Sequence, residues 1–136
     1  IKKLELNLKI RRRNFNFLRN FFSKNNNFFE VPKREPEIET AWLAFPLLIK
    51  KNKFYDRTDL QIFLEKNNIQ TRTIFTGNIL KQPIMKSQKY KKHRIAEINS
   101  TDIMIRGMLL GCHQSLKIKD VKKMTSAIYG YIKSFK

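Results

Sequence analysis

The chain has 136 residues, 41% of them hydrophobic, which is enough for one domain with a modest core and too few for two. Its 29 Lys and Arg residues outnumber 11 acidic residues and give a net charge of +18. The single cysteine, Cys112, excludes a disulfide or thiolate zinc framework within the chain. The longest apolar run, residues 41–49, is far shorter than the roughly 20 residues of a membrane-spanning helix.

The positive charge has two interpretations. Many cations attract a polyanion, so a small basic nucleic-acid-binding module is one candidate. The other is biased composition, because the excess is mostly Lys among many Asn, Ile and Phe residues and runs from Lys2 to Lys136. The chain also lacks a reader motif of the RRM or KH type. The second interpretation is favoured, and we expect no specific nucleic-acid partner.

A long helix is predicted first, because one stripe recurs at helical spacing: Leu4, Leu8, Phe15, Leu18 and Phe22. An Asn-rich run ends it, and Pro32 and Pro36 indicate a polar connector to about residue 40. Residues 41–49 then predict a buried strand, with Trp42 in the core.

Asp56 is the expected cap of a second helix that ends near Asn67 and Asn68. The alternation in residues 69–74 predicts a short strand. A break at Gly77 and a short helical piece before Pro83 should follow.

Residues 87–94 predict a basic loop, and Ser100, Thr101 and Asp102 should cap a short helix ending at Arg106. Residues 108–113 predict another strand, and an amphipathic helix should begin at Lys119. The pattern indicates an α+β fold, with flanking helices on one side of a small, mainly antiparallel sheet.

Several motifs together resemble one family. Residues 71–83 read Thr-Arg-Thr-Ile-Phe-Thr-Gly-Asn-Ile-Leu-Lys-Gln-Pro, which resembles the TRxxFxGNxxxQP segment of the DegT/DnrJ/EryC1/StrS sugar aminotransferases, nearest to the nucleotide-hexose 3-dehydratases. Residues 11–15 are similar to the family's RRRNF run and residues 41–46 to its SWFGFP strand. Residues 56–72 and 100–116 resemble further segments in the same order, so the likeness covers nearly the whole chain.

The resemblance implies the C-terminal small domain of a fold-type I transferase that depends on pyridoxal phosphate (PLP). Residues 1–24 would be an inter-domain linking helix, 25–40 a connector and 41–136 the small domain, with the N-terminal PLP-binding large domain absent from this chain. That missing domain would supply the Schiff-base Lys, or the His that replaces it in dehydratases. No catalytic residue is therefore expected here, nor activity of this segment alone.

The resemblance also implies a function for the whole protein. It would be a cytoplasmic homodimer that uses pyridoxal or pyridoxamine phosphate on a nucleotide-linked 4-keto-6-deoxyhexose. A 3-dehydratase for the sugars of cell-surface polysaccharide such as lipopolysaccharide is favoured, and a sugar aminotransferase is the alternative. We expect no membrane partner.

Five residues in the motif are expected to contact the substrate: Arg72, Phe75, Gly77, Asn78 and Gln82. The Arg fork suits a carboxylate or phosphate, and an Asn amide suits sugar hydroxyls. The alternative is a capped turn in which Gly77 serves the backbone and Arg72 pairs with an acid such as Glu65. His93 and His113 lack a cluster of metal ligands, so no metal site is predicted; His113 and Cys112 are expected to be structural.

Overall fold

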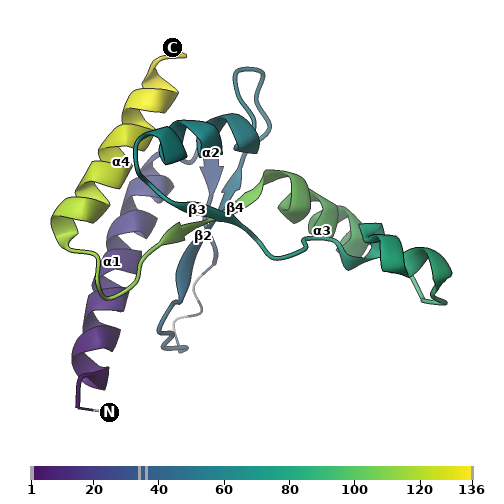
Figure 1. Cartoon of the computed structure of the whole chain (residues 1–136), viewed down its shortest axis with the longest axis horizontal. Coiled ribbons are helices and arrows are strands. Elements are labelled where there is room, and N and C mark those ends of the chain that lie inside the picture. Colours follow the sequence, from purple (N-terminus) through teal and green to yellow (C-terminus); the bar gives the residue numbers. More distant parts are fainter. Residues whose placement is uncertain (1, 34, 36, 136) are drawn as a thin grey trace.

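A computed structural model of the chain describes residues 2–33, 35 and 37–135. Four strands form one sheet in the order β1-β2-β4-β3, and every neighbouring pair is antiparallel. They are β1 (Phe29–Glu30), β2 (Ala44–Ile49), β3 (Thr71–Thr73) and β4 (Gly107–Gly111). The helices are α1 (Leu4–Lys24), α2 (Arg57–Lys66), α3 (Arg94–Arg106) and α4 (Ile118–Lys133), with 3-10 turns at Ile79–Lys81 and Pro83–Ser87. The predicted α+β fold is confirmed (Figure 1).

One face of the sheet carries the core. Alternation along β2 buries Phe45, Leu47 and Ile49 and leaves the residues between them half-buried on the other face. Helix α1 packs on the buried face, since the rings of Phe15 and Phe22 lie 5.0 and 5.4 Å from that of Phe45. Helix α4 runs beside α1 in Figure 1 and adds its own buried stripe to the same core: Val121, Met124, Ile128 and Ile132.

The predicted strand at residues 41–49 begins three residues late. Trp42 lies before the ladder, and its ring stacks on Phe15 at 4.3 Å between centroids and 6° between planes. Its carbonyl accepts from Arg11 and from the thiol of Cys112 at 3.5 Å each. Contacts with Phe15 and Arg11 of α1 therefore fix the position of Trp42, which takes no part in strand pairing.

Helix α2 begins where predicted. Asp56 accepts from the backbone N–H of Asp59 at 2.9 Å, and the Asp59 carboxylate accepts from the backbone N–H of Asp56 at 2.9 Å, which makes a capping box. The helix ends at Lys66, and Asn68 two residues later has φ at +58°, a value that Asn tolerates better than most residues.

Replacing Asp56 with Ala should lower the free energy of unfolding by about 1 kcal/mol, because the backbone N–H of Asp59 loses its acceptor. Urea unfolding of the variant measures this. Asp56→Asn, which keeps an acceptor at the cap, should recover most of the loss, and equal losses in both variants would contradict the assignment.

The prediction for α3 is wrong at its start. The helix begins at Arg94 rather than at residues 100–102, and the His93 ring nitrogen Nδ1 caps it by accepting from the N–H of Ala96 at 3.3 Å. Ser100 and Thr101 lie inside the helix, where their hydroxyls donate to the carbonyls one turn back.

Helix α3 and the two 3-10 turns extend away from the sheet, and we call residues 75–106 the arm (Figure 1). The helix buries none of its own side chains. It is held at its base, where Arg57 donates to the carbonyl of Met104 at 2.6 Å and Arg106 donates to that of Ile49 at 2.9 Å.

Candidate functional site

Arg72 lies on the face of the sheet opposite the core. Its position in β3 pairs with Leu109 of β4, which pairs in turn with Pro46 of β2, so the three side chains share that face. Arg72 also lines a groove of about 560 Å³, whose other lining residues come from β4 and the loop that follows it, from the segments leading into β2 and β3 and from the start of α4. We call it the Arg72 groove; its charged or ionisable lining residues are Arg72, His113, Asp120 and Lys123.

The cations of this groove are available to a ligand. Among the residues that the structure describes, the ion pairs are Arg12–Glu39 and Arg106–Asp102, and Arg72 is exposed. The alternative pairing of Arg72 with Glu65 is wrong: Oε1 of Glu65 accepts from the backbone N–H of Thr71 at 2.6 Å and from its hydroxyl at 3.0 Å. The acid Asp120 accepts from the backbone N–H of Lys117 at 2.8 Å.

His113 was expected to be structural, but its side chain is exposed and lines the groove. Its backbone supplies the structural contact instead, because its carbonyl accepts from the Asn14 amide at 3.1 Å. Sequence analysis missed the residue because only the pairing of β3 with β4 brings it near Arg72.

Asn14 fixes the segment that carries His113. This residue of α1 has no exposed surface, and its amide Nδ2 also donates to the carbonyls of Leu116 at 3.1 Å and Cys112 at 3.5 Å. Beside it, Nε of Arg11 donates to Oε1 of Gln114 at 2.8 Å. The polar residues of the predicted linking helix therefore bind the loop that leads from β4 to α4.

The other four predicted site residues lie at the base of the arm, outside the lining of the Arg72 groove. The Phe75 ring is 87% exposed, with φ at +44°. Gly77 has φ at +65° and touches Met104 of α3. Gln82 donates through Nε2 to the carbonyl of Thr76 at 3.1 Å, which closes the turn.

Asn78 is buried, with 1% of its surface exposed. Its Nδ2 donates to the Thr101 hydroxyl at 2.9 Å and the Glu97 carbonyl at 3.3 Å, and its Oδ1 accepts from the N–H of Leu80 at 2.9 Å. The amide is thus used inside the arm and shapes the turn. A substrate contact by Asn78 stays a prediction.

Cys112 is a buried free thiol, as expected. Burial, opposed by the nearby Arg11, raises its pKa to about 11. A thiol in an unfolded chain ionises near about pH 8.5, so the native state keeps this contribution to its stability below that pH and loses it as pH rises toward 11.

We therefore expect Cys112 to react with a disulfide reagent such as Ellman's only after unfolding. At pH 8 the absorbance change should be slow for the native chain and fast in urea, because the native thiol is neutral and covered. Fast reaction of the folded protein would contradict this arrangement.

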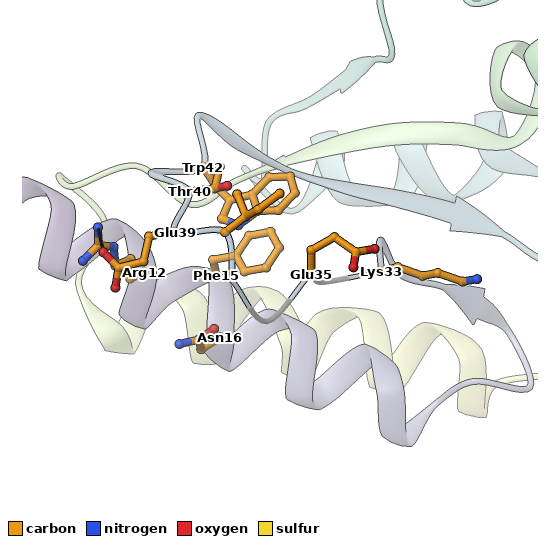
Figure 2. Close-up of a pocket in the computed structure, with 9 residues that line it drawn as sticks. Arg12, Phe15, Asn16, Lys33, Glu35, Glu39, Thr40 and Trp42 are labelled. Atoms are coloured by element: carbon orange, nitrogen blue, oxygen red, sulfur yellow. Dashed lines mark ion pairs between the residues drawn. The ribbon is translucent and has the colours of Figure 1, made fainter.

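A second cavity lies between α1 and the connector, and Figure 2 shows it. The stacked rings of Phe15 and Trp42 form one wall, and the Arg12–Glu39 ion pair of 2.8 Å lies at another. At about 190 Å³ it is smaller than the 300 Å³ or so at which ligand pockets usually begin. Other cavities of about 540 to 570 Å³ equal the Arg72 groove in size, and the groove is the better candidate because it brings Arg72 together with His113 and Lys123.

Within the described part of the chain, no group of three His, Cys, Asp or Glu side chains could hold a metal ion. A search of the same residues finds no helix both long and apolar enough to cross a membrane.

Comparison with known proteins adds to this geometry. The model of the DegT/DnrJ/EryC1/StrS aminotransferase family matches residues 1–129. The lipopolysaccharide biosynthesis protein RfbH of Salmonella typhimurium is 27% identical over 127 residues, which cover 93% of this chain and 29% of RfbH. A GDP-4-keto-6-deoxy-D-mannose 3-dehydratase of Escherichia coli O55:H7 is 30% identical over 115 residues, 84% of this chain and 29% of the enzyme.

One similar solved structure is a GDP-4-keto-6-deoxymannose-3-dehydratase with a trapped adduct of PLP and glutamate. It superposes with a TM-score of 0.80 at 27% identity, over 93% of this chain and 32% of that one. The chain thus spans about three tenths of the length of these relatives.

Proposed function

Because this chain belongs to the DegT/DnrJ/EryC1/StrS aminotransferase family, we propose that it is the C-terminal, substrate-facing part of a nucleotide-sugar 3-dehydratase. The family expected from the sequence is confirmed, as is the use of PLP by a solved relative. The proposed substrate is a nucleotide-linked 4-keto-6-deoxyhexose that loses its 3-hydroxyl. One observation carries the proposal: Arg72, in the family's Thr-Arg motif, has its side chain exposed on a groove beside His113.

The groove fits only part of a PLP-bound reaction centre. An Arg, a His and a Lys suit a phosphate or carboxylate. Among its lining residues, however, there is no Phe, Tyr or Trp to cover a pyridine ring. We therefore place the cofactor, in its pyridoxal or pyridoxamine form, mainly on the N-terminal domain that the family implies; bound there, it would supply an electron sink. No chemical step is assigned to residues of this chain.

The residues of the chain would bind and orient the substrate. The Arg72 guanidinium can form two hydrogen bonds to one anionic group, and His113 and Lys123, which line the same groove, can add further donors. The exposed Phe75 ring can cover the apolar face of a sugar. Gly77 and Asn78 hold the turn that presents Phe75, and Gln82 closes it.

The organisation of the whole protein is part of the proposal. Residues 1–24 would form the helix that links the two domains, and residues 25–40 would be the connector that follows it. Residues 41–136 would form the small domain, which closes one wall of the active site. We also propose a homodimer in the cytoplasm, a compartment that suits biosynthetic relatives such as RfbH. A sugar aminotransferase of the same family is the alternative function, favoured by the name of the matching family itself.

Replacing Arg72 with Gln should weaken binding of a GDP-linked sugar by roughly 100-fold, since a paired guanidinium contact is lost. Arg72→Lys should recover only part of the affinity, because Lys keeps the charge without the fork. Calorimetric titration of the protein from the complete reading frame, with GDP-mannose, measures both.

Arg94→Gln is the matched control, since it removes the same charge from another exposed arginine. It should change the affinity by less than about threefold. An equal loss in the control and in Arg72→Gln would mean that net charge alone sets the affinity, and unchanged binding in Arg72→Gln would remove Arg72 from the site.

A further inference from the structure

The outer end of the arm is strongly basic. No acidic residue lies between Glu65 and Glu97, and residues 86–94 carry five exposed cations: Lys86, Lys89, Lys91, Lys92 and Arg94. Of the two ion pairs in the described residues, neither involves this segment. We call residues 84–98 the basic tip; Figure 1 shows the arm reaching away from the sheet and from α1 and α4.

Aliphatic side chains are exposed next to these cations. Ile84 is 67% exposed, Ile95 65% and Ile98 54%. Ile95 and Ile98 are three residues apart on α3 and so share one side of the helix. Tyr90 is also exposed, with the Lys92 ammonium 5.7 Å from the centre of its ring.

This combination distinguishes between polyanions. Nucleic acids bind cations together with aromatic rings on which bases stack, and the rings of the basic tip are those of Tyr90 and His93, fewer than its exposed aliphatic side chains. A bilayer of anionic lipid attracts the cations and accepts aliphatic side chains among its acyl chains, while Tyr suits the level of the headgroups. Three exposed isoleucines beside five cations match the second surface.

We propose that the basic tip binds the surface of an anionic lipid bilayer. This would be a peripheral contact, which needs no spanning helix and is compatible with the finding that the described residues contain none. It revises the expectation of no membrane partner, which considered only spanning segments. The contact is independent of the catalytic assignment, because it uses neither Arg72 nor His113.

Sedimentation with vesicles tests the proposal. The whole chain should bind vesicles containing about one third phosphatidylglycerol and should not bind phosphatidylcholine vesicles, with binding that weakens as salt rises. Changing Lys89, Lys91 and Lys92 together to Ala should weaken binding by roughly 100-fold, since each lysine near an anionic surface contributes about a factor of five.

The matched control removes three exposed lysines from α4, on the other side of the molecule: Lys119, Lys122 and Lys133 to Ala. It leaves the same net charge as the tip variant and should bind within about threefold of the unchanged chain. Equal losses in the two variants would overturn the proposal, because binding would then follow total charge.

The double change Ile84→Ser and Ile95→Ser tests insertion. It keeps every charge and should weaken binding by roughly tenfold or more, because two exposed aliphatic chains no longer reach the acyl region. Unchanged binding would contradict a lipid contact of this kind. The proposal would also be contradicted if the chain did not bind the anionic vesicles but bound a single-stranded RNA through Lys89, Lys91 and Lys92.

Discussion

Gly77→Ala should release the arm from its base. A Cβ at Gly77 would clash with Cα and Cβ of Met104, so α3 would have to move. The φ of +65° adds strain for any residue with a side chain. Together these effects should cost about 3 kcal/mol, and hydrogen exchange of the α3 amides should speed up by roughly 100-fold.

Gly130→Ala provides a control of opposite sign. Gly130 lies inside α4, and a Cβ there meets nothing within 4 Å. This variant should gain up to about 1 kcal/mol in urea unfolding, since Ala favours the helix over Gly. If Gly77→Ala left exchange in α3 unchanged, the close packing of the turn on Met104 would be contradicted.

Asn14→Ala should cost about 3 kcal/mol of unfolding free energy. Its buried amide donates to the carbonyls of Cys112, His113 and Leu116, and the variant would lose all three bonds. The His113 carbonyl would keep the N–H of Leu116 as a donor, and the Leu116 carbonyl would keep Arg13. Urea unfolding gives the magnitude. Because the same bonds hold the segment of His113, the NMR signals of that ring should also shift.

Asn16→Ala is the matched control, two residues along the same helix and exposed. It should change stability by less than about 0.5 kcal/mol. Similar losses at both positions would mean that the effect comes from the helix itself rather than from the bonds of Asn14.

Local signals in the sequence predicted much of the fold. The Asp56 cap, the alternation before Gly77 and the stripe of α4 each depend on neighbouring residues, and each gave the right element. The apolar stripe in residues 4–22 also predicted helix α1 correctly, but it could not show that the Phe15 ring stacks on the Trp42 ring. That contact needed the tertiary structure, and it moved the start of β2.

Helix α3 shows where local reasoning failed. Its exposed isoleucines form no buried stripe, and its cap is a His ring rather than one of the usual Ser, Thr, Asp or Asn side chains. Ser100 and Thr101 look like caps in the sequence, yet they form bonds inside the helix. A helix held mainly at its base leaves no amphipathic pattern to read.

The candidate site was predicted in part. The family motif pointed to Arg72, which the structure places on a groove. It could not reveal that His113 lines the same groove, since strand order brings the two together. The motif also could not reveal that the Asn78 amide donates to the Thr101 hydroxyl. That hydrogen bond exists because α3 begins earlier than expected and places Thr101 inside the helix.

The most direct test of the account is the reaction catalysed by the protein from the complete reading frame, loaded with PLP and supplied with glutamate and GDP-4-keto-6-deoxymannose. Mass spectrometry of the sugar product distinguishes the outcomes. A 3-dehydratase should give a product that has lost the oxygen at carbon 3, and Arg72→Gln should form less of it. A product that instead gains an amino group would establish the aminotransferase alternative. An unchanged substrate here and with the corresponding dTDP-linked sugar would contradict a nucleotide-sugar enzyme.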